Sequence, residues 1–251
     1  MKTGRTELDP RDSVDAVRFA RERLGFDPDP VQTELLRSGT KRGLLNCTRQ
    51  WGKSTVTAIL ALHFALTHEE ATVIVASPSA RQSGEFLRKV RGFARRLGER
   101  GRGDGDNAIS VMLGNGSRVV GLPGKEDTIR GFSNVGLMLI DEAAWVPDEL
   151  YWALRPMLAA SDGGVWLMST PAGKRGFFYR EWSKGEGWER FEVKGWDCPR
   201  FSKTYLESER GWMEERVFRQ EYECAFTEME GQWLEEDVME KVWREDWGPV
   251  W

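Results

Sequence analysis

The sequence predicts an α/β protein of three layers, in which helices cover both faces of a mostly parallel sheet. Three observations support this fold class. Short apolar runs of strand length alternate with longer segments of helical length along most of the chain. Two of these runs, at 71–78 and 135–140, are apolar almost throughout, as strands buried on both faces are. Finally, 40% of the 251 residues are hydrophobic, which is enough for a sizeable core.

The first part of the chain is expected to begin with helices and then to alternate. Pro10 suits the first turn of a helix and Gly25 suits its exit, so one helix is predicted between them. A short apolar run, a loop and an apolar segment of helical length then predict a strand, a turn and a helix. The predicted elements are helices at 10–25 and within 26–36, strands at 44–47 and 71–78, and helices at 53–68 and 79–99.

The second part continues the alternation with one interruption. Two short apolar runs around Gly114-Asn115-Gly116-Ser117 predict an antiparallel hairpin added to the main sheet. Pro147 is expected in the first turn of a helix, and Pro171 is expected to stop a core strand. The predicted elements are the hairpin at 109–122, strands at 135–140, 163–170 and near 190–196, and helices at 147–161, near 175–182 and at about 202–225.

Composition excludes several classes of protein. No run approaches the roughly 18 apolar residues of a membrane span, and the polar start MKTGRTELDPRD is unlike a signal peptide. The three cysteines, Cys47, Cys198 and Cys224, lie far apart and there are only two histidines, so neither a zinc site nor a disulfide framework is expected. These features predict a soluble protein of a reducing cytoplasm with no membrane partner.

The formal net charge of −4 is unevenly distributed. Between residues 81 and 102, eight Arg and Lys residues stand against two Glu residues. A basic helix followed by a Gly-rich basic loop could contact a polyanion such as DNA. The alternative is that these charges only form the solvated face of a helix.

The stretch NCTRQWGKST (46–55) carries the chemistry of a phosphate-binding loop. It ends in Gly52-Lys53-Ser54, as the pattern G-x-x-x-x-G-K-[ST] does, but Cys47 takes the place of the first glycine. In such a loop, backbone N–H groups surround phosphate oxygens, the lysine reaches the outer phosphates and the hydroxyl binds Mg²⁺. A small Cys47 is compatible with that position if its φ is negative. The setting between a strand and an apolar helix favours a nucleotide site.

A pair of acids follows the predicted strand at 135–140. Asp141, at the end of that strand, could join the magnesium shell, and Glu142 could orient and deprotonate a water for attack on a γ-phosphate. The alternative is that both acids end a strand in solvent. Their position downstream of a phosphate loop favours the catalytic interpretation.

Further polar residues are candidates for the same site. Ser169 and Thr170 lie at the end of the strand at 163–170 and could lie beside the attacking water and respond to phosphate loss. Upstream, Phe26 could provide a stacking surface and Gln32 an amide for the edge of adenine, although each could equally be structural.

Taken together, these residues resemble the ATPase domain of the large terminase subunit, the DNA-packaging motor of tailed double-stranded DNA phages. CTRQWGKS is similar to that family's deviant Walker A loop, S/C-R-Q-x-G-K-[ST]. The similarity extends in one order from about residue 10 to about residue 235. The other matching motifs are D-P-x-Q at 29–32, N-G-S-R-[IV] at 115–119, L-P-G at 122–124, R-G at 130–131, I-D-E-A at 140–143 and S/T-T-P at 169–171.

The resemblance implies a P-loop NTPase fold of the ASCE/RecA-like type with a small, lid-like helical part at the C-terminal end. It divides the chain into N-terminal helices with an adenine-side segment (1–42), a P-loop ATPase core (43–200) and a helical lid or linker (201–251). Such domains usually continue into a nuclease domain of RNase H-like fold. Too little sequence follows the lid to build one, so the chain is expected to be either an expressed fragment or a natural ATPase-only protein.

The resemblance also assigns roles by position. Lys53 would bind the β- and γ-phosphates, Ser54 and Asp141 would hold Mg²⁺, Glu142 would be the catalytic carboxylate, and Arg49 would contact or sense the γ-phosphate. Ser169 and Thr170 would couple hydrolysis to movement. The expected ATP-binding residues are Phe26, Gln32, Cys47, Thr48, Arg49, Gln50, Trp51, Gly52, Lys53, Ser54 and Thr55.

The family implies partners and a place of action. Its members work as homo-oligomeric rings on double-stranded DNA, with the portal protein and the small terminase subunit, in the cytoplasm of the infected bacterial host. An arginine from a neighbouring subunit completes each site, because it stabilises charge that develops in the transition state. Arg118 and Arg130 are candidates for it, as are the arginines between 88 and 102.

Two other functions are compatible with these motifs. The first is a helicase-like DNA translocase, which would normally carry a second RecA-like domain; the residues after 171 are too few for one. The second is a nucleotide-binding scaffold without turnover, which would not need Lys53, Asp141 and Glu142 together.

Overall fold

The computed structural model describes residues 8–99, 109–122, 132 and 134–228. Its centre is a seven-stranded sheet in the order β3-β4-β2-β5-β6-β1-β7. Every neighbouring pair is parallel except β3 and β4, which form the predicted antiparallel hairpin. The strands are β1 (Arg42–Cys47), β2 (Thr72–Ala76), β3 (Ser110–Met112), β4 (Arg118–Leu122), β5 (Val135–Asp141), β6 (Gly164–Ser169) and β7 (Glu189–Val193).

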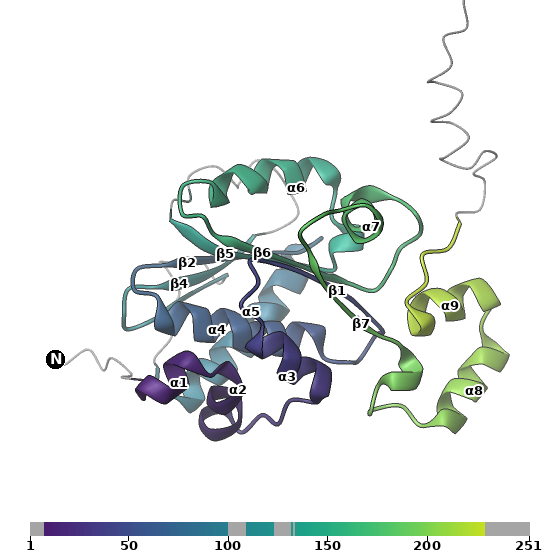
Figure 1. Ribbon diagram of the computed structural model, residues 1–251, viewed down its shortest axis with the longest axis horizontal. Helices are drawn as coiled ribbons and strands as arrows, with labels where there is room; N and C mark the ends of the chain where they lie inside the picture. The colour runs from purple at the N-terminus through teal and green to yellow at the C-terminus, as the bar shows by residue number, and fades with distance from the viewer. Residues whose placement is uncertain (1–7, 100–108, 123–131, 133, 229–251) are drawn as a thin grey trace, which may run out of the picture.

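Helices cover both faces of this sheet, so the predicted three-layer fold class is confirmed (Figure 1). One layer holds α4 and α5 with the N-terminal helices beneath them, and the opposite layer holds α6 and α7. The α-helices are α1 (Pro10–Val14), α2 (Ala16–Arg18), α3 (Pro30–Arg37), α4 (Lys53–Thr67), α5 (Ala80–Arg96), α6 (Asp148–Leu154), α7 (Gly176–Ser183), α8 (Lys203–Trp212) and α9 (Glu215–Glu223). Among the described residues, no helix has both the length and the apolar character that a bilayer crossing requires.

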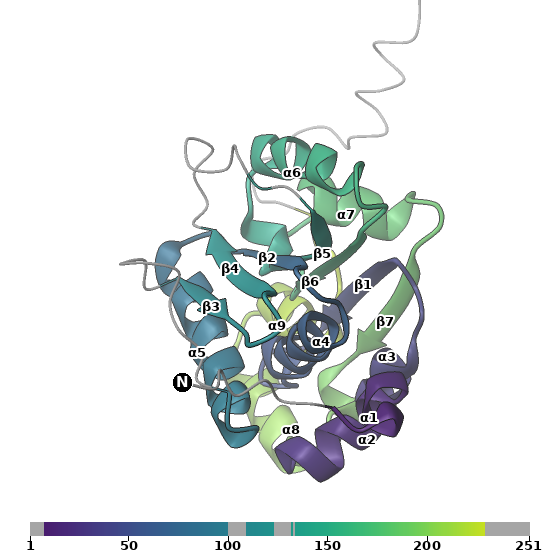
Figure 2. The ribbon, with the colours of Figure 1, turned by 90° about the vertical axis from the view of Figure 1, so that its left-hand side faces the viewer.

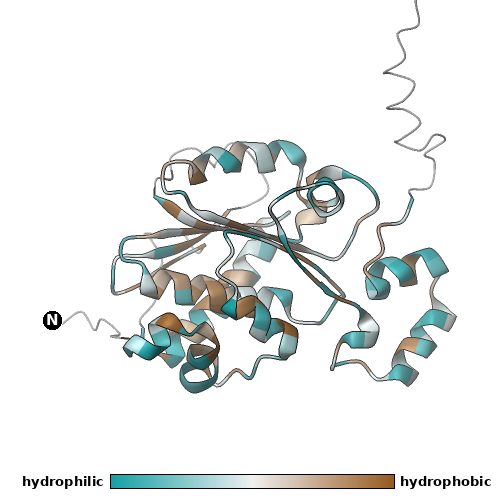
Figure 3. Cartoon of the chain, viewed as in Figure 1, coloured by the Kyte–Doolittle hydropathy of each residue, from teal (hydrophilic) through white to brown (hydrophobic). Residues whose placement is uncertain are grey.

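Alternating side chains of the strands build two hydrophobic cores. In β1, Leu45 packs against the α4 layer, whereas Leu44 packs against the α6 layer. In β2, Val73 and Val75 contribute to the first core and Ile74 to the second. Because each strand is apolar on both faces, hydrophobic residues run along the sheet and α4 (Figure 3).

The strand order determines what meets at the carboxyl edge of the sheet. β1, which precedes the phosphate loop, is separated from β5, which carries the paired acids, by β6. In a parallel sheet the loops after adjacent strands share one edge, and ligands bind there. The ends of β1, β5 and β6 are therefore brought together. Helices α8 and α9 form a small lobe beyond β7 (Figure 1), which lies on the far side of the molecule in Figure 2.

Three predicted helices are interrupted. The helix expected at 10–25 breaks at Asp15, whose extended backbone and side chain cap α2; a turn of π-helix, Phe19–Arg23, then completes the segment. The helix expected at 147–161 ends at Leu154, since Pro156 cannot donate a helical hydrogen bond, and a 3₁₀ turn follows.

The prediction of one long helix at about 202–225 is wrong. Met213 is extended (φ −95°, ψ 154°) and the chain turns back, giving the separate helices α8 and α9. Leu206, Phe218 and Tyr222 pack together between them. Burying these apolar groups against each other outweighs the loss of helical continuity, because a single straight helix would expose them.

The close approach of β1 and β6 gives a testable prediction. A β-carbon at Gly43 would overlap the ring of Trp166, which is buried and stacks on Phe191. We expect Gly43→Ala to lower the free energy of unfolding by about 2–3 kcal/mol, measured by urea denaturation, since the buried ring has no space to move. Gly39→Ala is the control, because nothing lies within 4 Å of a β-carbon there; equal stability of the two variants would contradict this account.

Candidate active site

The phosphate loop connects the end of β1 to the first residue of α4. Gly52 has φ 104°, a left-handed conformation that favours glycine, and Gln50 is also left-handed at φ 62°. Cys47 has a negative φ, which is the condition under which it can replace the first glycine. Its thiol points into the core, and burial raises its pKa, so the thiol stays protonated.

Lys53 closes the loop on itself. Its buried ammonium donates to the carbonyls of Cys47 (2.8 Å) and Thr48 (3.1 Å) and to the hydroxyl of Thr170 (3.2 Å). Removing an ammonium from water costs several kcal/mol, and hydrogen bonds from charged donors return about 1.5–3 kcal/mol each. Three such hydrogen bonds together are large enough to offset the desolvation cost. The loop can therefore hold its shape without a bound anion.

Ser54, the residue after Lys53, meets Asp141 at the end of β5. The Ser54 hydroxyl lies 3.1 and 3.3 Å from the two carboxylate oxygens of Asp141. Burial, with the charge of Glu142 beside it, raises the pKa of Asp141 to about 6, while the Ser54 hydrogen bond opposes the shift. A buried carboxylate next to a hydroxyl provides hard oxygen ligands, which Mg²⁺ prefers. The pair therefore fits a magnesium ion.

Glu142 follows Asp141 at the end of β5, but its side chain has different surroundings. It has φ 53°, a left-handed conformation that is uncommon for a residue with a side chain. Asp141 is buried, whereas Glu142 is half-buried and lines an open cavity. The backbone thus presents two neighbouring carboxylates to different surroundings, one next to Ser54 and one in contact with solvent.

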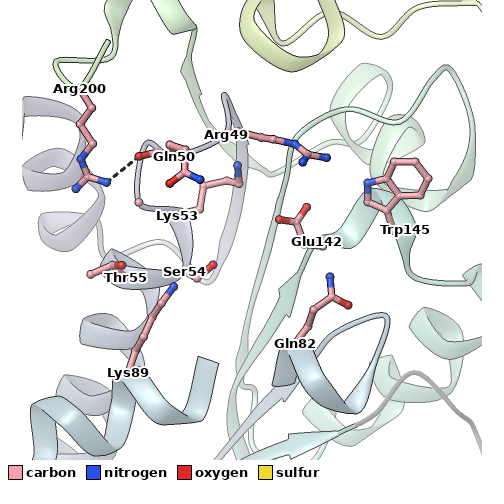
Figure 4. A pocket seen from close by; sticks show the side chains of 11 residues that line it. Arg49, Gln50, Lys53, Ser54, Thr55, Gln82, Lys89, Glu142, Trp145 and Arg200 are labelled. Atoms are coloured by element: carbon pink, nitrogen blue, oxygen red, sulfur yellow. Dashed lines mark hydrogen bonds between the residues drawn. The ribbon is translucent and has the colours of Figure 1, made fainter. Parts of the chain in front are cut away.

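The cavity has a volume of about 520 Å³ and opens at the carboxyl edge of the sheet (Figure 4). Its lining combines loop residues with residues from distant parts of the chain. Gln82, Lys89, Trp145 and Arg200 were not predicted from the sequence. The lining residues are Arg49, Gln50, Gly52, Lys53, Ser54, Thr55, Gln82, Lys89, Glu142, Trp145 and Arg200.

Some predicted ATP-binding residues have structural contacts in this structure. Gln32 forms a capping box with Asp29 and donates to the Trp51 carbonyl (3.2 Å). Trp51 is buried and donates from its ring to Asp29 (2.8 Å). These contacts fasten the loop to α3. Phe26 is half-buried against the core and lies outside the lining of the described cavity.

The C-terminal helices also hold the loop and the strand before it. The Thr48 hydroxyl donates to the carbonyl of Glu221 (2.9 Å), and the amide of Asn46 donates to the carbonyl of Cys224 (2.9 Å). Arg49, predicted to contact the γ-phosphate, forms an ion pair with the Glu221 carboxylate. On the other side of the loop, Arg200 donates to the Gln50 carbonyl (2.7 Å).

The predicted coupling residues lie at the end of β6. The Ser169 hydroxyl donates to the carbonyl of Thr170 (2.7 Å), and the Thr170 hydroxyl contacts both Lys53 and the Cys47 carbonyl. Thr170, the residue after β6, therefore touches the phosphate loop directly.

The two candidate trans arginines are not brought to this cavity. Arg118 lies at the opposite end of the sheet, at the start of β4, where its guanidinium covers the Phe132 ring and donates to Thr72. Arg130 lies outside the described residues.

With this geometry established, the chain can be compared with known proteins. Residues 44–241 match the family described as "Terminase large subunit, T4likevirus-type, N-terminal". The chain belongs to this family. Among curated terminase large subunits, that of Thermus virus P23-45 is 26% identical over 243 residues, which cover 82% of this chain and 50% of the relative. The chain thus spans about half the length of the curated terminases it matches.

Solved terminase structures share the fold, which confirms the predicted P-loop NTPase architecture. The large terminase ATPase domain of Thermus phage P74-26 aligns with a TM-score of 0.74 at 23% identity, covering 82% of this chain and 97% of that one. The large terminase of a thermophilic bacteriophage in complex with ADP aligns with a TM-score of 0.63 at 14% identity, covering 86% and 53%. The complex of that same terminase with ATP-gamma-S aligns with a TM-score of 0.61 at 15% identity, covering 86% and 52%.

The environment of Asp141 in this terminase domain predicts a stability cost. Its folded pKa of about 6 lies above the ordinary 3.8, so the cost of the charged carboxylate is complete above about pH 6 and absent below about pH 4. We expect Asp141→Asn to stabilise the ligand-free protein by about 1–3 kcal/mol at pH 8, with the gain shrinking towards pH 4.5. Urea unfolding at both pH values checks this, with the exposed Asp197→Asn as control; a destabilised Asp141→Asn at pH 8 would refute the prediction.

Proposed function

We propose that this chain is the ATP-hydrolysing motor domain of a phage DNA-packaging terminase, which couples Mg-ATP hydrolysis to translocation of double-stranded DNA into a procapsid. The observation that carries the proposal is that Lys53, Ser54 and Glu142 line one open cavity at the carboxyl edge of the sheet. Asp141 is buried beside this cavity, within hydrogen-bond distance of the Ser54 hydroxyl. Membership of the terminase family and the nucleotide complexes of the thermophilic phage terminase support it.

The loop would bind the triphosphate of ATP. Backbone N–H groups after Asn46, together with the amino terminus of α4, point positive charge at phosphate oxygens. Lys53 would exchange one of its carbonyl partners for a β- or γ-phosphate oxygen. Because the loop is fastened by α3, α9 and Arg200, it would need little rearrangement to accept the anion.

Ser54 and Asp141 would hold Mg²⁺ through a hydroxyl and a carboxylate oxygen. When bound, the ion neutralises charge on the β- and γ-phosphates. Asp141, whose buried charge is otherwise unfavourable, would then stay ionised.

Glu142 would act as the general base. Its half-buried carboxylate lines the cavity beside the loop and can accept a proton from a water that attacks the γ-phosphorus, while the bond from that phosphorus to the β-phosphate oxygen breaks. Arg49 would leave Glu221 to contact the γ-phosphate. Thr170, whose hydroxyl contacts Lys53 and the Cys47 carbonyl, and Ser169 before it would pass the loss of that phosphate to β6.

Translocation would require partners outside this chain. We propose a homo-oligomeric ring that meets the portal protein and the small terminase subunit in the cytoplasm of the infected host. A neighbouring subunit would supply an arginine, for which Arg118 and Arg130 remain candidates, so an isolated domain should hydrolyse ATP slowly.

The exposed face of α5 is the proposed contact for DNA. Arg81, Arg88 and Arg95 recur every seventh residue and are all exposed. That spacing places successive guanidinium groups about 10 Å apart along one side of the helix. Arg88 pairs with Glu85 in the free protein, which a phosphate group could replace. Contacts of this kind are independent of DNA sequence, as a packaging motor requires.

The role of Glu142 predicts a separation of binding from turnover. Glu142→Gln should lower ATP hydrolysis by at least about 100-fold, because the amide cannot accept the proton from water. The affinity for ATP, measured by calorimetry, should stay within the same order of magnitude. Glu149→Gln, an exposed acid on α6, is the control and should hydrolyse ATP normally. ATP binding without turnover in both the wild type and Glu142→Gln would instead indicate a nucleotide-binding scaffold.

The α5 contact predicts a change in salt dependence. Removing two phosphate contacts with Arg81→Ala and Arg95→Ala should weaken duplex DNA binding and reduce the slope of log K against log salt by about 2. Fluorescence anisotropy at several salt concentrations measures both. The control is Arg37→Ala with Arg175→Ala, which removes the same charge from exposed positions outside α5. Equal slopes in the two double variants would exclude α5 as the contact.

A further inference from the structure

Lys89 brings a second lysine into the nucleotide cavity from a different element. It lies in the middle of α5, one heptad after Gln82, and both residues line the cavity with Ser54 and Glu142. Residues on the adjacent side of α5, including Phe86 and Val90, are buried in the core and fix the rotation of the helix. Figure 4 shows the Lys89 side chain extending from α5 towards Ser54.

The other cations of the cavity have partners in the protein. Lys53 donates to two carbonyls and a hydroxyl, Arg49 pairs with Glu221, and Arg200 donates to the Gln50 carbonyl. Within the described part of the chain, Lys89 makes no hydrogen bond or ion pair. Of the four cations that line the described cavity, Lys89 is thus the one that can receive an anion without giving up a protein contact.

The surroundings of Lys89 are consistent with such an anion. The cavity leaves the side chain accessible to solvent, while the protein atoms around its stem lower the pKa of its ammonium through partial burial. The charges of Asp141, Glu85 and Glu142 act in the opposite direction. Two of these three carboxylates belong to the end of the cavity where Mg²⁺ and the γ-phosphate would lie.

We infer that Lys89 is a second phosphate-binding lysine, which contacts the β–γ end of a bound nucleoside triphosphate from α5. This inference rests on the proposed nucleotide site and adds a residue to it. A mobile ammonium at this position acts as a point charge and does not require a fixed geometry. Its contribution should be larger for a triphosphate than for a diphosphate, since the γ-phosphate adds charge nearest to Glu142.

The test compares Lys89→Met with the wild type. Methionine keeps most of the length and the unbranched apolar stem of the side chain, and it removes the ammonium. By calorimetry in the presence of Mg²⁺, the Kd for a non-hydrolysable ATP analogue should rise about tenfold and the Kd for ADP by clearly less, as expected for losing one charge-assisted contact. Lys89→Arg should restore most of the affinity, because it restores the charge.

Two matched variants make the outcome decisive. Lys184→Met removes an exposed lysine after α7, outside the described cavity, and should leave both Kd values unchanged. Lys53→Ala should abolish nucleotide binding; if it does not, the proposed nucleotide site itself is wrong. If Lys53→Ala fails to bind while Lys89→Met binds the ATP analogue like the wild type, only the inference on Lys89 is overturned. An equal loss for ADP and the analogue, or tighter binding by Lys89→Met, would also overturn it.

Discussion

The hydrogen bonds of the Lys53 ammonium organise the carboxyl edge of the sheet. They join the end of β1, the first residue of the loop and the end of β6, three backbone segments of which the last lies far from the others in sequence. Burying this cation costs desolvation free energy, and the hydrogen bonds offset that cost only while these acceptors stay in place. Any phosphate oxygen that draws the ammonium away must therefore compete with the contacts that link the loop to β6. Nucleotide binding and the position of Thr170 would be coupled for this physical reason.

A second coupling runs through the C-terminal lobe. Helix α9 reaches the loop through Thr48 and Arg49 and reaches β1 through the carbonyl of Cys224, which accepts from Asn46. Arg49 has one guanidinium and two possible anions, Glu221 in the free protein and a γ-phosphate when ATP is bound. Since a ligand shifts a conformational equilibrium only by its differential affinity, this competition would let the nucleotide change how firmly α9 is held. The lobe would then respond to the presence of the γ-phosphate rather than to binding in general.

Local patterns in the sequence predict much of the fold, but not the contacts made across it. Each strand of the sheet has an apolar run or a turn signal of its own, so the order of elements and the hairpin of β3 and β4 follow from short windows. The phosphate loop and the paired acids match motifs whose residue types are explained by the chemistry they perform, so they could be predicted as well. By contrast, the break at Met213 depends on the packing of Phe218 against Leu206, and Arg200 reaches the loop across a large separation in sequence. Gln32 illustrates the same limit, since the amide considered for adenine has both ends engaged with Asp29 and Trp51.

Helix α5 has three differently oriented faces, and this arrangement bears on how the motor would work. One face packs Phe86 and Val90 into the core, a second places Gln82 and Lys89 in the nucleotide cavity, and a third exposes Arg81, Arg88 and Arg95. A helix packed at the density of a protein interior moves as a unit, because its core side chains leave no space for independent shifts. If phosphate binds at Lys89 and DNA binds at the arginines, both ligands act on the same rigid element. A small displacement of α5 on loss of the γ-phosphate would then move the DNA contact directly, without passing through the sheet.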